Sequence, residues 1–335
     1  MHHGQSGEIA DGTLAGATCS GNRAYGFLAS HLIEGLLSRG ALVTGVVRDR
    51  PSESYLQLAE IDKKISLATG DIADLDFCRR IINEQQIQDV FHLAAQAIVG
   101  LANRSPLSTF DSNIRGTYVL LEACRELRAD KCPLEAIVVA SSDKAYGDQE
   151  VLPYVETMPL LGMHPYDASK VCADIVTRTF AATFRLPAAV TRCANLYGPG
   201  DLNFSRIIPD TFRALILGQR PVIRSDGKPL RDYLFVKDAV AGYLVLAEKL
   251  STGRCHGQAF NLGTGMPVTV VELVKQIIKS TNSRVEPKIL DEAKGEIKHQ
   301  YLDSTLAKKT LGWCADTPLK KGLSHTYSWY KSYLS

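Results

Sequence analysis

The chain has 335 residues, of which 45% are hydrophobic and 22% are charged, and its formal net charge at pH 7 is +2. A charge this close to neutral argues against nucleic acid or an anionic membrane surface as a partner. No apolar run approaches the roughly 18 residues that cross a bilayer, and the polar first residues lack the apolar centre of a signal peptide. We therefore expect a cytoplasmic protein with no membrane partner.

The eight cysteines are scattered along the chain, without a CxxC pair or a Cys/His cluster. Zinc ligation and a disulfide framework both need patterned spacing, so we expect free thiols, mostly buried, and no metal.

The first part of the chain has the order of a dinucleotide-binding unit: a strand, a glycine-containing turn and a helix. The strand is predicted over residues 9–15 and the helix over 27–38, where leucines and isoleucine form an apolar face. Gly16 and Gly26 would form the turn, followed by Leu28, where backbone amides approach a pyrophosphate. Seven residues, Cys19 to Tyr25, separate Gly16-Ala17-Thr18 from Gly26. Either this segment bulges outward and Gly26 still serves the cofactor, or cofactor binding is damaged.

Further strands are predicted over residues 42–47, 65–68 and 90–96. Arg48-Asp49-Arg50 follows the first of these. An acidic residue about 20 positions after the glycine turn holds the ribose hydroxyls of NAD, whereas an arginine accommodates the 2′-phosphate of NADP. Asp49 fits the first role and Arg48 the second, so both NAD and NADP stay open.

The rest of the chain is organised around a buried strand predicted over residues 136–140. Ser142, Asp143 and Lys144 follow it directly. In open α/β sheets, ligands bind at the carboxyl ends of the strands. We therefore expect these polar side chains at an active site.

A helix predicted from Tyr166 to about Phe184 supplies the next chemical group. Tyr166 and Lys170 are four residues apart, so their side chains share one helical face. The neighbouring cation and the helix N-terminus both favour the phenolate of Tyr166. With the hydroxyl of Ser142, this arrangement makes a base suited to oxidising an alcohol.

These motifs, together with the later segment RCANLYGPG, resemble the extended short-chain dehydrogenase/reductases, in the NAD-dependent epimerase/dehydratase branch that modifies nucleotide sugars. The resemblance covers residues 26–335 and implies an α/β fold: a Rossmann-like, doubly wound parallel sheet with a smaller C-terminal substrate-binding domain. Strands that alternate with helices through about residue 195 indicate the same sheet. We expect residues 1–195 and about 232–258 to form the NAD(P)-binding domain, and residues 196–231 and 259–335 the nucleotide-sugar-binding domain.

The resemblance also implies binding residues at matching positions. On the cofactor side they are Asp71, Ile72, Leu93, Ala94, Ala95 and Gln96. On the substrate side, Asn195 and Arg231 would hold the phosphates of a nucleotide-diphosphate sugar, with Arg206 in the same pocket. The helix over residues 113–127 and the helix after Tyr166 would form the four-helix homodimer interface common in the family.

Once the family is accepted, the two residues after Ser142 indicate the reaction. A 4-epimerase needs only oxidation and re-reduction at C4, whereas a 4,6-dehydratase also needs a base for the C5 proton and an acid for the departing C6 hydroxyl. The Ser142-Asp143-Lys144 version resembles the CDP-glucose 4,6-dehydratases, which implies Asp143 as the acid and Lys144 as the base; the GDP-mannose 4,6-dehydratases are similar as well. CDP, GDP, UDP and dTDP all stay open as the nucleotide.

The sequence thus predicts a nucleotide-diphosphate-hexose 4,6-dehydratase that uses NAD or NADP. Two alternatives remain: a nucleotide-sugar 4-epimerase of the same fold, and a non-catalytic sugar-nucleotide-binding homologue with a damaged glycine turn. In the epimerase, Asp143 and Lys144 would have no role in the reaction. A separate interpretation of these two residues is that they form only a structural ion pair.

Overall fold

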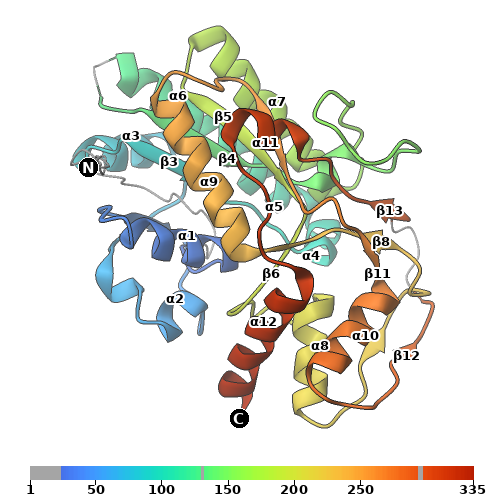
Figure 1. The fold of residues 1–335 in the computed structure, drawn as a ribbon. Coiled ribbons are helices and arrows are strands. Elements are labelled where there is room, and N and C mark those ends of the chain that lie inside the picture. The colour runs from blue at the N-terminus through green and yellow to red at the C-terminus, as the bar shows by residue number, and fades with distance from the viewer. Residues whose placement is uncertain (1–23, 130–131, 293–296) are drawn as a thin grey trace, which may run out of the picture.

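The computed structural model describes residues 24–129, 132–292 and 297–335, so the strand predicted over 9–15 lies outside the described residues. At its centre is a sheet of four parallel strands in the order β10-β5-β4-β3 (Figure 1). These strands are β3 (Asp89–His92), β4 (Ala136–Ala140), β5 (Ala188–Cys193) and β10 (Ala259–Leu262). A second parallel pair consists of β1 (Thr44–Val47) and β2 (Ser66–Thr69).

The central strand β4 is buried on both faces. Ala136 and Val138 belong to one apolar cluster, whereas Ile137 and Val139 belong to another. A parallel strand that is covered by helices on both sides needs an unbroken apolar run rather than alternation. This explains why the sequence AIVVA predicts the strand with its observed bounds.

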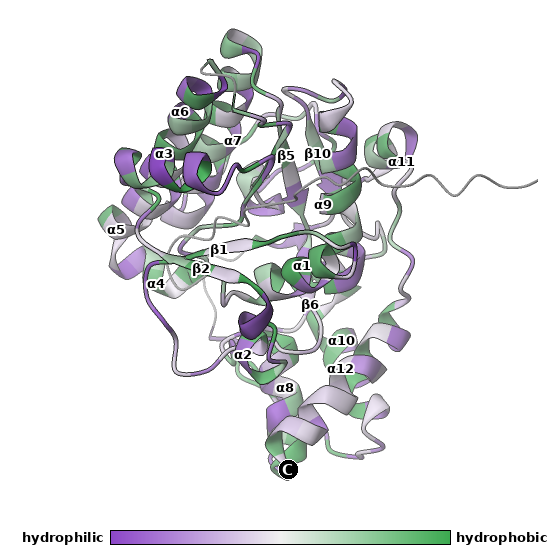
Figure 2. Ribbon diagram, turned by 90° about the vertical axis from the view of Figure 1, so that its left-hand side faces the viewer, coloured by the Kyte–Doolittle hydropathy of each residue, from purple (hydrophilic) through white to green (hydrophobic). Residues whose placement is uncertain are grey.

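Helices cover both faces of this sheet, which makes the fold doubly wound, as the sequence predicts. One face carries α1 (Phe27–Leu37), α9 (Val236–Ser251) and α11 (Thr305–Leu311). The other carries α3 (Leu75–Glu84), α6 (Gly116–Ala129) and α7 (Pro165–Phe184). Figure 2 shows α1 as a mostly apolar helix, which fits its packing against α9.

Short elements connect these layers. They are α2 (Tyr55–Leu58), η1 (Asp62–Lys64), α4 (Val99–Arg104), α5 (Pro106–Phe110), the π-helix η2 (Asp111–Arg115) and the 3₁₀-helix η3 (Asp143–Tyr146).

A second, smaller lobe lies below the sheet in Figure 1 and has its own apolar core. Its helices are α8 (Ile207–Ile216), α10 (Val270–Ser280) and α12 (Leu319–Leu334), and its core includes Phe212, Leu273 and Tyr330. Short strands join it to the large lobe: β6 (Asn195–Tyr197) with β9 (Tyr233–Phe235), β7 (Val222–Ile223) with β12 (Lys288–Ile289), and β8 (Leu230–Arg231) between β11 (Val268–Thr269) and β13 (His299–Gln300).

The structure corrects the predicted domain boundary at residue 259. β10 pairs with β5 in the main sheet, and Phe260 and Leu262 lie in the core that α1 and α9 share. α11 packs into the same core. β10 and α11 therefore belong with the large lobe, whereas α10 and α12 belong with the small one.

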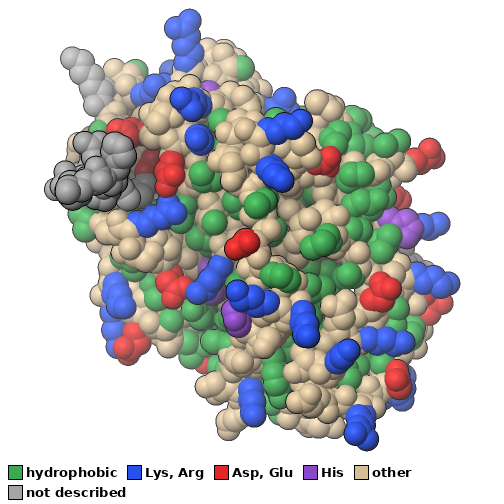
Figure 3. Space-filling view, viewed as in Figure 1, with side chains coloured by type: hydrophobic (Ala, Val, Ile, Leu, Met, Phe, Trp, Pro, Cys, Tyr) green, Lys and Arg blue, Asp and Glu red, His purple; other side chains and the backbone are tan. Residues whose placement is uncertain are grey.

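Within the described ranges, no helix is both long and apolar enough to cross a membrane. Acidic and basic side chains are interspersed on the face that Figure 3 shows. The same described residues contain no group of His, Cys, Asp and Glu that could hold a metal ion.

Candidate active site

A cleft of about 850 Å³ lies where the carboxyl ends of the main-sheet strands face the small lobe. Open α/β sheets bind ligands at this edge. The cleft brings together most of the predicted site residues, which come from segments far apart in the sequence: Gly26, Leu28, Leu93, Ala95, Ser142, Asp143, Lys144, Tyr166, Lys170, Asn195, Arg206 and Arg231.

The remaining predicted residues do not line the cleft. Ile72 and Ala94 are buried in the core, Gln96 is half-buried beside Asn113 of η2, and Arg48, Asp49 and Asp71 form a separate cluster. Gly16 lies outside the described residues.

Tyr166 and Lys170 occupy the first two turns of α7. Pro165 opens this helix, because its fixed φ suits the first helical position and its missing N–H has no partner to lose there. Both side chains are buried, and Lys170 Nζ lies 6.0 Å from the centroid of the Tyr166 ring. Lys170 Nζ also donates a hydrogen bond to the carbonyl oxygen of Ala140 at 2.6 Å. The last residue of β4 thus fixes the cation beside the phenol, which is the arrangement that the spacing predicts.

Ser142 caps the short helix η3, which starts where β4 ends. Its Oγ accepts a hydrogen bond from the Lys144 backbone N–H at 3.3 Å and donates one to Asp143 Oδ1 at 3.0 Å. Asp143 is 2% exposed, and no described residue bonds its Oδ2. Burial raises the pKa of the Asp143 carboxyl, against the opposing effects of Lys144 and of the Ser142 hydrogen bond. Asp143 therefore keeps its proton to a higher pH than an exposed aspartic acid does.

Lys144 does not form an ion pair with Asp143 within the described part of the chain. Its Nζ donates instead to Oε1 of Gln300 in β13, at 3.3 Å. The sequence analysis missed Gln300, because a two-residue strand leaves no periodic pattern and the contact spans 156 positions. The alternative of a structural ion pair between Asp143 and Lys144 is thus not what the structure contains.

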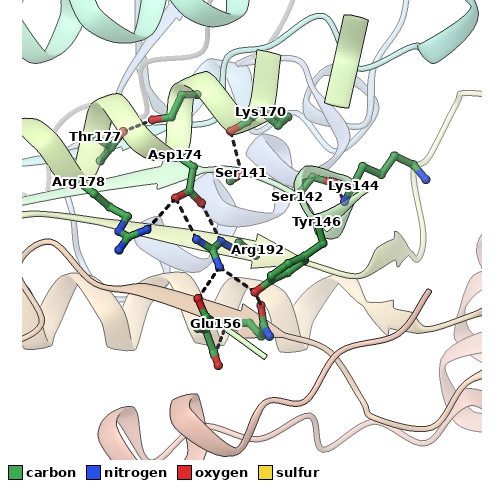
Figure 4. A network of polar contacts seen from close by, with 12 residues as sticks. Ser141, Ser142, Lys144, Tyr146, Glu156, Lys170, Asp174, Thr177, Arg178 and Arg192 are labelled. Atoms are coloured by element: carbon green, nitrogen blue, oxygen red, sulfur yellow. Dashed lines mark hydrogen bonds and ion pairs between the residues drawn. The ribbon is translucent and has the colours of Figure 1, made fainter. Parts of the chain in front are cut away.

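Below η3, Tyr146 joins a buried network around Arg192 (Figure 4). Arg192 in β5 donates to both carboxylate oxygens of Asp174 in α7, at 2.8 and 3.0 Å, and to the Tyr146 hydroxyl at 2.8 Å. Tyr146 in turn donates to Asn261 Oδ1 in β10, at 2.7 Å, and burial raises the pKa of its hydroxyl to about 12. This network connects the helix of Tyr166 to the segment of Asp143, while Lys144 extends away from it in Figure 4.

The substrate-side residues of the sequence prediction all reach the cleft, and each is held by the protein itself. Asn195 Nδ2 donates to the Asp232 carbonyl at 3.1 Å, and Arg206 Nη1 donates to Asp201 Oδ2 at 2.9 Å. Arg231 donates to the backbone carbonyls of Leu230, Ile297 and Lys298. These bonds fix the side chains at the wall before any ligand enters.

The cofactor side of the cleft opens on the N-terminus of α1. Gly26 is the N-cap, and no side chain caps the helix there. Free backbone N–H groups and the positive end of the helix dipole fit a pyrophosphate. Ala24 and Tyr25 are the last two of the seven residues that precede Gly26, and both are buried in the core beside α1. The residues present therefore fit a dinucleotide at this end of the cleft.

Arg48, Asp49 and Asp71 form an exposed charge cluster after β1 and β2. Arg48 Nε lies 3.0 Å from Asp49 Oδ2, and its Nη1 lies 3.7 Å from Asp71 Oδ2. Asp49 and Asp71, the two acidic residues predicted on the cofactor side, therefore both face the guanidinium of Arg48.

Comparisons with known proteins agree with this geometry. Residues 24–326 match the family model described as GDP-mannose 4,6 dehydratase. The chain is 30% identical to the CDP-glucose 4,6-dehydratase of Salmonella typhimurium, over 92% of this chain and 89% of that protein. It is also 30% identical to the UDP-glucose 4-epimerase of Mycolicibacterium smegmatis, over 92% of this chain and 97% of that one.

Solved structures give the same fold. The UDP-glucose 4-epimerase of Thermotoga maritima, in complex with UDP-glucose, superposes with a TM-score of 0.86 at 29% identity, covering 96% of this chain and 100% of that one. The enzyme of the same name from Stenotrophomonas maltophila, with bound NAD, gives a TM-score of 0.85 at 26% identity, covering 96% and 99%. Relatives of this chain thus include both 4,6-dehydratases and 4-epimerases, and solved relatives bind NAD.

Proposed function

The chain belongs to the NAD-dependent epimerase/dehydratase family, and on that premise we propose that it is a nucleotide-diphosphate-hexose 4,6-dehydratase. One observation carries the proposal: Asp143 and Lys144 line the same cleft as Tyr166 and Lys170. An epimerase restores the alcohol at C4 and needs no second acid and base. A dehydratase needs both, because it removes a proton and a hydroxyl from neighbouring carbons.

Tyr166 would take the proton of the C4 hydroxyl, with Lys170 beside its ring favouring the phenolate. The Ala140 carbonyl holds Lys170 in that position. When bound, NAD supplies the acceptor of the C4 hydride and the donor of the C6 hydride. The open N-terminus of α1, with Gly26 and Leu28, would hold its pyrophosphate.

The elimination of water would then use Asp143 and Lys144. The C4 ketone acidifies the proton on C5, and Lys144 would take that proton. Asp143 protonates the C6 hydroxyl, which leaves as water. The raised pKa of Asp143 supports this role, since a proton donor must hold its proton near neutral pH.

The substrate we propose is a CDP-hexose, as in the Salmonella relative. Arg206 and Arg231 line the small-lobe side of the cleft, as does Arg224. Arginine suits this place because its planar guanidinium matches the oxygens of a diphosphate.

We also propose a homodimer formed through α6 and α7. The two helices lie against each other, with the Arg125 guanidinium 5.4 Å from the centroid of the Phe184 ring. Tyr118 and Ile175 are exposed on them, which supports a covering partner. Sedimentation equilibrium of the wild type and of Ile175→Glu tests this: the wild type should be dimeric and the variant monomeric, and a monomeric wild type would contradict it.

The proposed reaction is tested by incubating the protein with CDP-glucose, GDP-mannose, UDP-glucose and dTDP-glucose, with and without added NAD⁺ or NADP⁺. Alkaline ultraviolet absorbance reports a 4-keto product. We expect a signal with CDP-glucose. An epimeric sugar without any 4-keto product would favour the second candidate, a 4-epimerase, which the match to UDP-glucose 4-epimerases supports.

A further inference from the structure

Gln300 is a buried residue of the strand β13 that contacts the proposed base. β13 runs parallel to β8, and Gln300 lies in register with Arg231, a residue of the cleft. Its side chain is 0% exposed, and its Oε1 accepts the hydrogen bond from Lys144 Nζ. The contact therefore joins the segment after β4 to a strand that pairs with the cleft wall.

The other amide atom of Gln300, Nε2, is buried and has no hydrogen-bond partner among the described residues. The same is true of Asp143 Oδ2, in the residue next to Lys144. Leaving such an atom unsatisfied costs about 1–3 kcal/mol, and native structures contain few of them. Asp143 lines the cleft, so a polar ligand there can bond its Oδ2, whereas Gln300 lies behind the lining residues.

The charges around Lys144 come from two elements. Asp143 on η3 and Asp167 on α7 both interact with it: burial raises the pKa of each carboxyl, and Lys144 opposes that rise. Gln300 adds a third contact without adding charge. The bond to the Gln300 oxygen uses one N–H of Lys144 and so fixes the direction in which the rest of the amine points.

We propose that Gln300 is a positioning residue: the bond from Lys144 Nζ to its Oε1 directs the Lys144 amine toward the C5 proton. This inference rests on the proposed dehydratase function and adds a residue to it. Gln300 itself exchanges no proton; it acts through the orientation of Lys144.

The test uses the full-length protein and three variants. Gln300→Met removes the hydrogen bond to Lys144 at similar volume, and Gln300→Glu keeps the acceptor and adds a charge. His299→Ala changes an exposed neighbour in the same strand as a control. Circular dichroism establishes that each variant folds. Competitive acetylation with mass spectrometry measures the pH midpoint of Lys144 labelling, and steady-state kinetics measure 4-keto product formation.

We expect Gln300→Glu to move the midpoint of Lys144 labelling upward by about one pH unit, because a carboxylate stabilises the ammonium. Gln300→Met should lower kcat by up to about 100-fold, the cost of a misplaced catalytic group. His299→Ala should change neither quantity. If one Gln300 variant does not fold, the other still gives both readouts.

Different results would contradict the role of Gln300 and the dehydratase reaction. A wild type that makes 4-keto product, with Gln300 variants that match it in kcat and in Lys144 labelling, would overturn the role of Gln300. A wild type that makes only an epimer would overturn the dehydratase. The labelling midpoint would still report whether Gln300 contacts Lys144.

Discussion

Two buried polar clusters meet at the short helix η3, and they differ in how completely their atoms are paired. On one side, Tyr146 joins Arg192, Asp174 and Asn261, and every buried side-chain nitrogen and oxygen of these residues has a partner. On the other side, Asp143 and Gln300 flank Lys144, and each has one buried atom that no described residue bonds. The two clusters are only a few residues apart along the same helix.

We expect the fully paired cluster to stabilise the fold and the incompletely paired cluster to serve the reaction. A buried network that is satisfied by the protein alone rigidifies the fold. A buried cluster that is incomplete keeps hydrogen-bonding capacity for a ligand, at a cost in stability. The Arg192 network should therefore govern stability, whereas the Asp143 cluster should govern turnover.

The largest effect is expected for Asp143→Asn, because it removes the proposed acid. We expect turnover to fall by about 10²- to 10⁴-fold, the usual contribution of a general acid. The free energy of unfolding at neutral pH should not fall, since no hydrogen bond to Oδ2 is lost. The measurements are the rate of 4-keto product formation and the urea midpoint. Asp148→Asn, in an exposed residue of the same segment, is the matched control. Equal turnover in both variants would refute the role of Asp143.

The second-largest effect is a loss of stability, expected in the fully paired network around Arg192. Arg192→Met removes both hydrogen bonds to the buried carboxylate of Asp174 and leaves it only the partly exposed Arg178, which should cost about 3–5 kcal/mol in the free energy of unfolding. Urea denaturation followed by circular dichroism measures this loss.

Arg178 provides the control for that experiment, because it also faces Asp174, at 3.8 Å, but is 47% exposed. Arg178→Met should cost less than about 1 kcal/mol, as exposed ion pairs do. Similar losses in the two variants would show that burial does not distinguish these pairs.

A third effect is the pH dependence of stability. The folded-state pKa of Asp143 is raised, so its contribution to stability is full below the unfolded-state value of about 4 and is lost as pH rises through the folded-state value. Asp143→Asn should therefore gain stability relative to the wild type as the pH rises from 4 to 8, because the amide has no proton to lose. Urea midpoints at both pH values measure it. A constant difference across this range would contradict the burial of an ionisable group at this position.

The smallest effect is expected at the exposed cluster of Arg48, Asp49 and Asp71. With its guanidinium already paired to two carboxylates, Arg48 should contribute little to binding a 2′-phosphate. We expect NAD to bind more tightly than NADP, and Arg48→Ala to change the NAD affinity by less than about 1 kcal/mol. Calorimetric titration with both cofactors tests this. Tighter NADP binding that Arg48→Ala abolishes would reverse the assignment.

Much of the fold could be predicted from sequence, because local patterns determine it. The strand over 136–140 was predicted with its observed bounds, since a buried parallel strand is uniformly apolar. The helix predicted from Tyr166 to about Phe184 begins one residue earlier, at Pro165. The helix predicted over 113–127 exists as α6, but it begins as the π-helix η2 and continues to Ala129. A pattern of apolar residues does not distinguish a π-helical turn from the α-helix that follows it.

Contacts between distant segments could not be predicted in the same way. Asp238 lies inside α9 and accepts hydrogen bonds from Thr317, 79 positions further along the chain. Arg192 pairs with Asp174 only after β5 and α7 pack together. Gln300 reaches Lys144 only after the chain returns in β13. Each of these contacts depends on tertiary folding, so no local pattern carries it.

The central claim is that the hydride removed at C4 is delivered to C6. The most direct test is to incubate the protein with CDP-glucose deuterated at C4 and to locate the label in the product by mass spectrometry and NMR. The account predicts a 4-keto-6-deoxy sugar with deuterium at C6. Deuterium that remains at C4 of an epimeric, non-keto product would contradict it.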